Sequence, residues 1–272
     1  MHAAAYRALG LPHVYEAVRV EAEGLPAIVA ALRAGAYGGL NVTVPHKQRV
    51  MALVDRLDDS ARDVGAANTL VRTEGGEVVA YNTDAPALAA EIARVAGMVG
   101  ARAGRDGPWV GGRGLVIGSG GAARAAVVAM RRLGLGEIAV RARAFEDPAR
   151  REAFVRQAPA PVLAEPLTAP AGSRGEADAR TVAVVQATSA GMKGADPGAP
   201  IAEAVHWSAL PDQAVAIDVV YAPRDTPFLA AARARGLRCD DGLGMLARQG
   251  ALALEHWLGV SAPFEVMRAA LE

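Results

Sequence analysis

A glycine-rich turn between a buried strand and a helix constrains the fold of this chain more than any other feature. The strand is expected at 114–117 and the helix at 122–133. Between them the chain reads Gly118-Ser119-Gly120-Gly121-Ala122-Ala123, and Gly-x-Gly-x-x-Ala in this context is the fingerprint of a Rossmann-type nucleotide site. The glycines permit a tight turn, so that free N–H groups at the helix start can meet a pyrophosphate. A plain strand-to-helix turn is the alternative.

Strands and helices alternate along most of the 272 residues, which predicts an α/β protein. Apolar β-branched runs in the second half suit a parallel sheet that is covered on both faces. We expect strands at 14–20, 39–44, 67–72, 78–81, 114–117, 137–140, 181–185, 214–220 and 237–239. We expect helices at 1–11, 25–35, 48–57, 59–64, 85–96, 122–133, 228–235 and 245–258, and another from Pro263. Segment 101–113 is expected to be a loop, and 156–180 and 193–213 give weak signals.

Composition argues against several classes of protein. Lys plus Arg equals Asp plus Glu at 29 each, so no net field draws nucleic acid or an anionic membrane surface. Cys239 is the only cysteine, which rules out an internal disulfide and favours a reducing compartment. The five histidines are scattered without metal-ligand spacing, and no apolar run approaches the roughly 20 residues of a membrane span. We expect a cytoplasmic protein that binds neither metal, nucleic acid nor membrane.

Two strand ends carry polar side chains suited to proton transfer. Asn41-Val42-Thr43-Val44 is typical of a strand that stops at Pro45, because proline lacks an N–H and has a fixed φ. Lys47 follows at the strand-to-helix corner, and Tyr81-Asn82-Thr83-Asp84 ends another strand with a carboxylate. A lysine and an aspartate at neighbouring strand tips make a proton-handling pair. The competing interpretation is a surface lysine and an aspartate that caps a helix.

The end of the second strand in the nucleotide-binding half indicates which dinucleotide binds. An NAD site usually places Asp or Glu there, whereas this strand runs into Arg141-Ala142-Arg143. Guanidinium groups match the 2′-phosphate of NADP in charge and fork geometry. Glu146 and Asp147 come later, on the expected following helix. We therefore predict NADP as the cofactor; the alternative is that these arginines are solvated surface charges.

Several motifs occur together in a characteristic order. They are Asn41-Val42-Thr43-Val44-Pro45-His46-Lys47, Gly65-Ala66-Ala67-Asn68-Thr69-Leu70, Tyr81-Asn82-Thr83-Asp84, Gly118-Ser119-Gly120-Gly121-Ala122-Ala123-Arg124, Ala187-Thr188-Ser189-Ala190-Gly191-Met192, Asp218-Val219-Val220-Tyr221-x-Pro223-x-x-Thr226 and Gly242-Leu243-Gly244-Met245-Leu246-x-x-Gln249. With them the chain resembles the shikimate dehydrogenase family over nearly its whole length. The glycine turn is generic, but the first and last motifs together are highly specific.

This resemblance implies an NADP-dependent oxidoreductase that reversibly reduces 3-dehydroshikimate to shikimate, on the route to aromatic amino acids. Lys47 and Asp84 would then be the catalytic pair beside the reacting carbonyl or hydroxyl. A lysine ammonium can stabilise the charge that develops on that oxygen, or donate a proton to it. The side chains implied to bind the substrate are Thr43, Lys47, Asn68, Asp84, Tyr221 and Gln249. Taken singly, each position outside the catalytic pair also has an ordinary structural explanation.

The same resemblance implies a set of cofactor contacts and a domain arrangement. The residues implied to contact NADP are Asp59, Gly118, Ser119, Gly120, Gly121, Ala122, Arg143, Thr188, Val219 and Gly242. Asp59 is equally well explained as a helix N-cap. The implied architecture has two α/β domains with a cleft between them. They are a substrate domain over 1–84, a Rossmann-like NADP-binding domain over 85–240, and C-terminal helices over 241–272 that return to the substrate domain.

Three departures from the family pattern bear on function. Chains of this family carry a further strand and a Ser-x-Ser motif before the position of Met1, and those hydroxyls bind the substrate carboxylate. We expect Met1 to be an internal methionine, and the intact mass of the native protein tests this. For the sequence as written, each lost hydrogen bond would weaken binding of the substrate carboxylate by roughly 1.5–3 kcal/mol. Ala142-Arg143-Ala144 stands where the family has Asn-Arg-Thr, and Gln186 where it has Asn. Both of these changes predict weaker or less selective NADP binding, without removing the site.

Two other functions are compatible with the sequence. One is a shikimate/quinate dehydrogenase of broader specificity, and the other is a noncatalytic sensor of a shikimate-like ligand or a dinucleotide. Retention of Lys47 and Asp84 argues against the sensor, and absence of the carboxylate motif argues for it. The expected partner is the small-molecule substrate, shikimate or 3-dehydroshikimate, and a homodimer is an allowed assembly.

Overall fold

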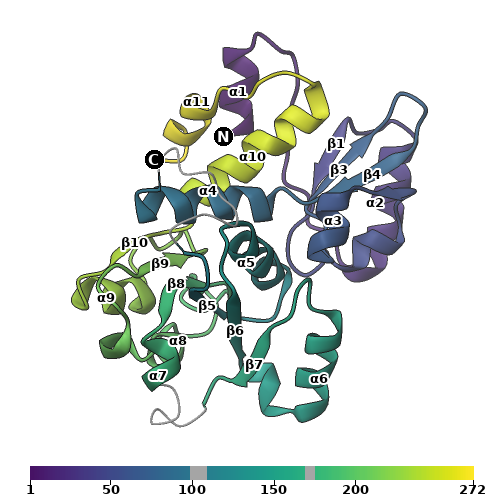
Figure 1. Cartoon of the computed structure of the whole chain (residues 1–272). Helices are drawn as coiled ribbons and strands as arrows, with labels where there is room; N and C mark the ends of the chain where they lie inside the picture. The colour runs from purple at the N-terminus through teal and green to yellow at the C-terminus, as the bar shows by residue number, and fades with distance from the viewer. Residues whose placement is uncertain (99–108, 169–174) are drawn as a thin grey trace. The chain divides into compact units, whose positions relative to one another are not determined.

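The computed structural model describes residues 1–98, 109–168 and 175–272, which divide into two compact units (Figure 1). Each unit has its own sheet and its own buried core. Unit 1 comprises Met1–Ala87 and Gly244–Glu272, and unit 2 comprises Leu88–Leu243. An α/β fold with a parallel sheet is therefore confirmed.

The chain passes between the units within two helices. One boundary falls inside α4 (Asp84–Ala96), and the other falls at the first residue of α10 (Leu243–Leu258). The expected loop at 101–113 lies largely outside the described residues, and Arg113 at its end begins a strand. Within the described ranges, no helix is long and apolar enough to span a membrane, and no group of His, Cys, Asp and Glu side chains could hold a metal ion.

Unit 2 is built on a six-stranded parallel sheet with the order β10-β9-β8-β5-β6-β7. The strands are β5 (Arg113–Ile117), β6 (Glu137–Ala142), β7 (Leu163–Pro166), β8 (Thr181–Gln186), β9 (Val215–Asp218) and β10 (Arg238–Asp240). The chain adds β6 and β7 on one side of β5, then returns to add β8, β9 and β10 on the other. The strand order therefore reverses between β5 and β8, and ligands of open α/β sheets bind at the carboxyl ends of strands beside such a reversal.

Helices cover both faces of this sheet (Figure 1). Leu115 and Ile117 of β5 belong to a buried cluster that includes side chains of the last helices of the unit. Val116, between them, points to the opposite face because side chains alternate along a strand, and it is also fully buried. The helices are α5 (Gly121–Arg132), α6 (Pro148–Gln157), α7 (Gly175–Asp178), α8 (Ala199–Glu203) and α9 (Pro227–Ala234), with 3₁₀ turns η3 (Arg143–Glu146) and η5 (Trp207–Ala209).

Unit 2 also buries a network of charged side chains. Arg113 of β5 and Arg141 of β6 are fully buried, and both donate to the carboxylate of Asp178, at 2.9 and 2.8 Å. Glu165 of β7 accepts from the same two guanidinium groups at 3.1 and 2.8 Å. Buried charges persist only when they are paired and hydrogen-bonded. Grouping Arg141 with Arg143 as a cation for NADP is therefore wrong, because the Arg141 guanidinium is engaged inside the protein.

Unit 1 contains a four-stranded mixed sheet with the order β1-β3-β4-β2. Its strands are β1 (Gly39–Asn41), β2 (Arg56–Leu57), β3 (Thr69–Arg72) and β4 (Val78–Tyr81). The expected hairpin of β3 and β4 is confirmed, and Gly76 supplies the positive φ of +87° that its turn needs. Helices α2 (Leu25–Arg33) and α3 (Asp59–Val64) lie in the same unit, with Leu32 of α2 and Ala61 of α3 in the buried cluster of the sheet.

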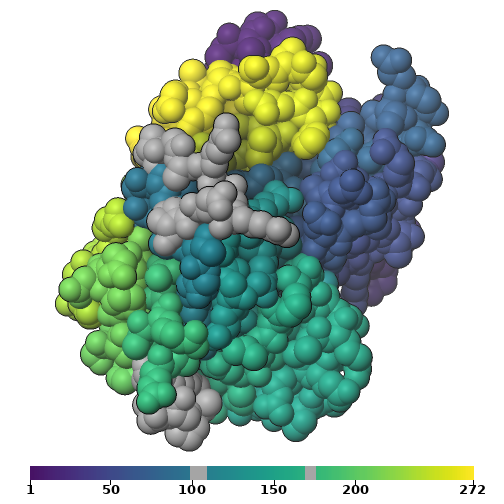
Figure 2. Space-filling view, in the orientation of Figure 1, coloured from purple at the N-terminus to yellow at the C-terminus, as the bar shows by residue number. Residues whose placement is uncertain are grey.

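A second cluster in unit 1 joins the two ends of the chain. Helix α1 (His2–Ala8) packs with α10 and α11 (Phe264–Ala269), seen as purple against yellow in Figure 2. The buried side chains of this cluster are Ala5, Tyr6, Ala251, Leu254 and Met267. Helix α10 thereby places its inner residues next to the sheet, as the hydrogen bond of 3.0 Å from Trp257 Nε1 to Leu70 O shows.

Two expectations for unit 1 are wrong. The segment 14–20 alternates like a strand but forms none, and Val14 and Val18 are 78% and 57% exposed. The segment 48–57, expected as a helix, forms a 3₁₀ turn, η2 (Arg49–Ala52), and then strand β2. Strand β2 pairs with the free side of β4, so that pairing with a neighbouring strand outweighs local helix propensity. A further 3₁₀ turn, η1 (Ala22–Gly24), precedes α2.

Candidate active site

Lys47 and Asp84 form an ion pair in unit 1, with 2.7 Å between Lys47 Nζ and Asp84 Oδ2. Lys47 belongs to the turn after β1, and its carbonyl oxygen accepts from Ala67 N at 2.8 Å. Asp84 is the first residue of α4, where the side chain of Asn82 accepts from Ala85 N at 3.1 Å and so caps the helix. Asp84 itself is left for other contacts. The two residues expected at neighbouring strand ends are therefore brought together.

Asn68 holds the second oxygen of Asp84. Its Nδ2 donates to Asp84 Oδ1 at 2.9 Å, and lies 2.9 Å from Thr83 Oγ1 and 3.3 Å from Gln249 Oε1. Its Oδ1 accepts from Thr83 N at 2.8 Å. Asn68 and Asp84 are each only 2% exposed. The carboxylate is thus fixed at both oxygens, by Lys47 on one side and by Asn68 on the other.

Lys47 is the more exposed member of the pair. The side chain of Lys47 is 16% exposed, and that of Asp84 is 4% exposed. A lysine ammonium has three N–H donors, of which Asp84 takes one and the remainder can reach a ligand oxygen. Hydrogen bonds of this kind are strengthened where water is largely excluded. The arrangement can therefore stabilise or protonate an oxygen that is bound at the exposed side of Lys47.

The other residues expected to bind substrate are placed in different ways. Gln249 lies on α10, and its Nε2 donates to Leu246 O at 2.9 Å while its Oε1 faces Asn68. Thr43 is exposed in the turn that carries Lys47 and lines a cavity of about 920 Å³ in unit 1. Tyr221 is 39% exposed and follows β9 in unit 2. Gln249 joins the hydrogen-bonded group around Asp84, and the substrate contacts of all three residues stay predictions.

Asp59 does not cap helix α3. The N-cap is Asp58, whose side chain accepts from Ser60 N at 2.9 Å. Asp59 is exposed in the first turn, and its Oδ1 lies 2.7 Å from Arg62 Nη2. The N-cap of α3 is therefore Asp58 and not Asp59, and contact between Asp59 and the cofactor stays a prediction.

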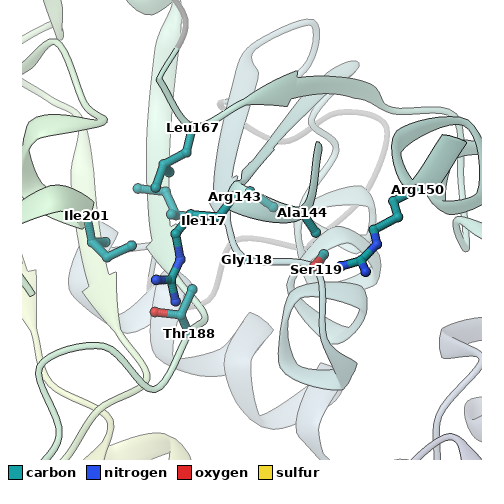
Figure 3. Close-up of a pocket in the computed structure, with 10 residues that line it drawn as sticks. Ile117, Gly118, Ser119, Arg143, Ala144, Arg150, Leu167, Thr188 and Ile201 are labelled. Carbon is teal, nitrogen blue, oxygen red and sulfur yellow. The ribbon is translucent and has the colours of Figure 1, made fainter. Parts of the chain in front are cut away.

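A cavity of about 480 Å³ opens in unit 2 where the strand order reverses (Figure 3). We call it the switch-point cavity, and its lining residues are Ile117, Gly118, Ser119, Ala142, Arg143, Ala144, Arg150, Leu167, Thr188 and Ile201. Strands β5 and β6 end at this cavity, and Thr188 comes from the loop after β8. Four expected cofactor residues therefore meet here: Gly118, Ser119, Arg143 and Thr188.

The glycine turn at this cavity fits a phosphate group. Helix α5 starts at Gly121, and no side chain of the described residues caps it, so its first N–H groups are available to a ligand. Gly118 has φ +123°, and a Cβ there would lie 3.1 Å from Ala187 O, so a larger residue would be strained. A Cβ on Gly120 would meet no described protein atom within 4 Å. Packing does not require glycine at that position, and the free space suits a bound ligand.

Two guanidinium groups face the switch-point cavity (Figure 3). Arg143 begins η3 directly after β6, and its guanidinium points toward Thr188 across the cavity that both residues line. Arg150, on α6, directs its guanidinium toward Ser119. Arg150 is absent from the expected site residues, and the signal that could have found it is the arginine-rich start of the helix after the cofactor strand. Two cations at one cavity suit a phosphate dianion.

Gln186 organises the loop that carries Thr188. It is 1% exposed at the end of β8, and its Nε2 donates to Thr188 O at 3.2 Å and to Ala190 O at 3.1 Å. Its Oε1 accepts from Thr188 N. The departure from the family's asparagine therefore leaves this loop held by three hydrogen bonds.

Val219 and Gly242 lie against each other in unit 2. A Cβ on Gly242 would come within 2.2 Å of Val219 O, so the backbones can approach only because residue 242 is glycine. The N–H of Gly242 donates to Val220 O at 3.0 Å. Next to them, buried Asp218 accepts from Thr226 Oγ1 at 2.7 Å and from Val220 N at 2.9 Å, and burial raises its pKa to about 6. These contacts fix the position of the two residues expected to flank the nicotinamide.

Comparisons with known proteins identify relatives along the whole chain. The family model described as the shikimate dehydrogenase substrate binding domain matches residues 1–70, and that of the shikimate 5′-dehydrogenase C-terminal domain matches 242–272. Shikimate dehydrogenase (NADP(+)) of Microcystis aeruginosa is 38% identical over 272 residues, which are 100% of this chain and 90% of that protein.

Solved structures are also similar to nearly the whole of this chain. The crystal structure of shikimate 5-dehydrogenase from Thermus thermophilus, in complex with NADP(H) and shikimate, is 34% identical with a TM-score of 0.78. That match covers 99% of this chain and 91% of the other. Quinate dehydrogenase from Corynebacterium glutamicum, in complex with NAD, is 26% identical with a TM-score of 0.78, over 98% of this chain and 91% of the other.

Proposed function

The chain belongs to the shikimate dehydrogenase family, and we propose that its Lys47–Asp84 ion pair carries out the proton transfer of the family's reaction. The protein is an NADP-dependent oxidoreductase that reversibly reduces 3-dehydroshikimate to shikimate. The observation that supports the role of the pair is its geometry: a buried carboxylate, held at both oxygens, orients the amine of a partly exposed lysine. We place the reaction in aromatic amino acid biosynthesis.

The pair acts on the oxygen of the reacting carbon. When bound, NADPH supplies the hydride for reduction, and NADP⁺ accepts it in the reverse direction. During reduction the carbonyl oxygen gains negative charge, which the Lys47 ammonium stabilises and then protonates. During oxidation the Lys47–Asp84 pair takes the hydroxyl proton. Asp84 orients the Lys47 amine toward that oxygen, and the hydrogen bond from Asn68 restrains rotation of the Asp84 carboxylate.

The remaining substrate contacts follow from the group around Asp84. Because the Asn68 amide already faces Asp84, Thr83 and Gln249, we assign it mainly to orienting these groups toward the ring. Gln249 and Thr43 supply further polar contacts from unit 1. In unit 2 the switch-point cavity would hold the cofactor phosphates: the N–H groups at the start of α5 would bind the pyrophosphate, and Arg143 would bind the 2′-phosphate. The substrate and NADP-binding roles are thereby assigned to unit 1 and unit 2 respectively.

Turnover tests the proposed function directly. Purified protein with shikimate and NADP⁺ should produce NADPH, followed by its absorbance, and 3-dehydroshikimate with NADPH should consume it. A protein that binds NADPH but turns over neither substrate would favour the noncatalytic sensor. Likeness to a quinate dehydrogenase bound to NAD favours one further candidate, a dehydrogenase of broader specificity. Equal kcat/KM for quinate and shikimate would support that candidate.

Replacing Arg143 with alanine should weaken NADP⁺ binding selectively. A charge-assisted hydrogen bond to a phosphate contributes about 1.5–3 kcal/mol, less where it is exposed, so we expect KM for NADP⁺ to rise about tenfold. KM for NAD⁺ should stay unchanged because NAD⁺ lacks the 2′-phosphate. Arg156→Ala is the matched control, because Arg156 is an exposed arginine on α6 that pairs with Glu152. Equal effects on both dinucleotides would contradict the role of Arg143.

We also propose a cytoplasmic location and a homodimeric assembly. The location is inferred from the biosynthetic reaction and from the single cysteine, Cys239, because a chain with one cysteine forms no internal disulfide. Light scattering during size-exclusion chromatography tests the assembly, and a mass near 28.0 kDa would contradict a dimer.

A further inference from the structure

We propose that the Asp196 carboxylate forms an ion pair with the Arg143 guanidinium when no cofactor is bound. We further propose that this ion pair sets the preference between dinucleotides with and without a 2′-phosphate. The inference rests on the proposed NADP site. The 2′-phosphate and Asp196 then compete for the same cation. Asp196 belongs to the loop after β8 and lies outside the motifs that suggested the function.

The ion pair joins two different parts of unit 2. Arg143 Nη2 contacts Asp196 Oδ2, and the two side chains are 68% and 57% exposed. The Arg143 guanidinium points toward Thr188 at the switch-point cavity (Figure 3). Asp196 therefore presents its negative charge at the place where a 2′-phosphate would meet this arginine.

The loop holds Asp196 in place through its backbone. Gly191 N donates to Asp196 O at 2.8 Å, and Ala195 N donates to Met192 O at 3.0 Å. Gly191 and Gly194 supply the positive φ angles of +92° and +82° at which the loop turns. These two hydrogen bonds close the loop on itself, so a ligand can displace the contact between Asp196 and Arg143 without opening the loop.

The second cavity arginine is less strongly engaged. The carboxylate of Asp147 accepts from Ala149 N at 2.9 Å and so caps α6, while Arg150 Nε lies 3.5 Å from its other oxygen. Arg150 can therefore contribute to a phosphate site without losing its own partner. Of the two arginines, Arg143 is the one whose release from a carboxylate governs phosphate binding.

The sign of the effect follows from the charges. Asparagine at position 196 removes the ion pair and also removes a negative charge that repels the phosphate. Exposed ion pairs are weak, so the expected gain in NADP⁺ affinity is about two- to fivefold. NAD⁺ carries no 2′-phosphate, so its affinity should not change. The ratio of the two dissociation constants therefore isolates the contribution of Asp196.

The test is calorimetric titration of the full chain with NADP⁺, NAD⁺ and adenosine 2′,5′-bisphosphate. Asp196→Asn should tighten binding of NADP⁺ and of the bisphosphate, and should leave NAD⁺ binding unchanged. Asp212→Asn is the matched control, because Asp212 is an exposed carboxylate of unit 2 that pairs with Arg235. It should change none of the three dissociation constants by more than about 1.5-fold.

A double variant links the effect to Arg143. In an Arg143→Ala background, Asp196→Asn should lose its effect, because the guanidinium for which it competes is gone. Unchanged or weaker NADP⁺ binding by Asp196→Asn alone would overturn the inference. The same tightening in the Arg143→Ala background would also overturn it. The NADP site itself is tested separately by Arg143→Ala alone, so that failure of the two proposals can be told apart.

Discussion

Replacing Lys47 with alanine is expected to lower kcat for shikimate oxidation by about 10²–10⁴-fold, the range for loss of a positioned proton donor or acceptor. Lys47 is the partly exposed member of the ion pair, and Asp84 is too buried to take over its contact with a ligand oxygen. NADPH should still bind, because the switch-point cavity belongs to unit 2. Steady-state kinetics and NADPH fluorescence measure the two quantities separately.

Arg49→Ala is the control for this experiment. Arg49 is an exposed cation two residues along the same segment, so its loss reports any general effect of charge on unit 1. It should leave kcat within about twofold of the wild type, since isolated surface charges act weakly. Wild-type turnover by Lys47→Ala would contradict the assigned role, as would loss of NADPH binding together with turnover.

Replacing Asp178 with alanine is expected to reduce the free energy of unfolding by about 3–5 kcal/mol. Asp178 has no exposed side-chain area, and its removal leaves the buried guanidinium groups of Arg113 and Arg141 short of a counter-charge. Glu165 and Glu137 remain, but their side chains are 27% and 31% exposed, and both already contact the arginines that they could neutralise. Chemical denaturation followed by circular dichroism measures the loss.

The matched control is Asp212→Ala. Asp212 also pairs with an arginine of unit 2, but its side chain is 90% exposed, so its loss should change stability by less than about 1 kcal/mol. Asp178→Asn, which keeps the shape and one acceptor, should fall between the two variants. A similar small loss for Asp178→Ala and Asp212→Ala would show that the buried network contributes little to stability.

Much of unit 2 could be predicted from the sequence because its signals are local. The glycine turn, the apolar strand before it and the helix after it lie within about twenty residues, and they form β5 and α5 as expected. The strand expected at 14–20 could not be judged in this way. Alternation indicates only that a segment can pair, and the described structure offers that segment no neighbouring strand. Strand β2 shows the opposite case, in which an available edge of β4 overrides a helical pattern.

The candidate site was predictable where residue type and position at a strand end coincide. Lys47 and Asp84 both follow strands, and they meet at hydrogen-bonding distance. The role of Asn68 as the support of Asp84 depends on contacts among residues far apart in the sequence, including Gln249. The burial of Arg141, two residues before exposed Arg143, depends on the buried carboxylates that β6 meets inside unit 2. A list of motifs carries neither kind of information.

The most direct test of the catalytic pair compares Lys47→Ala, Asp84→Asn and the double variant in the NADPH-forming assay with shikimate. Residues that act as one unit show strongly non-additive losses. Each single variant should therefore lose at least about 10²-fold in kcat, and the double variant should lie within about tenfold of the slower single variant. Losses that multiply in the double variant, or a wild-type kcat for Asp84→Asn, would contradict a catalytic unit of these two side chains.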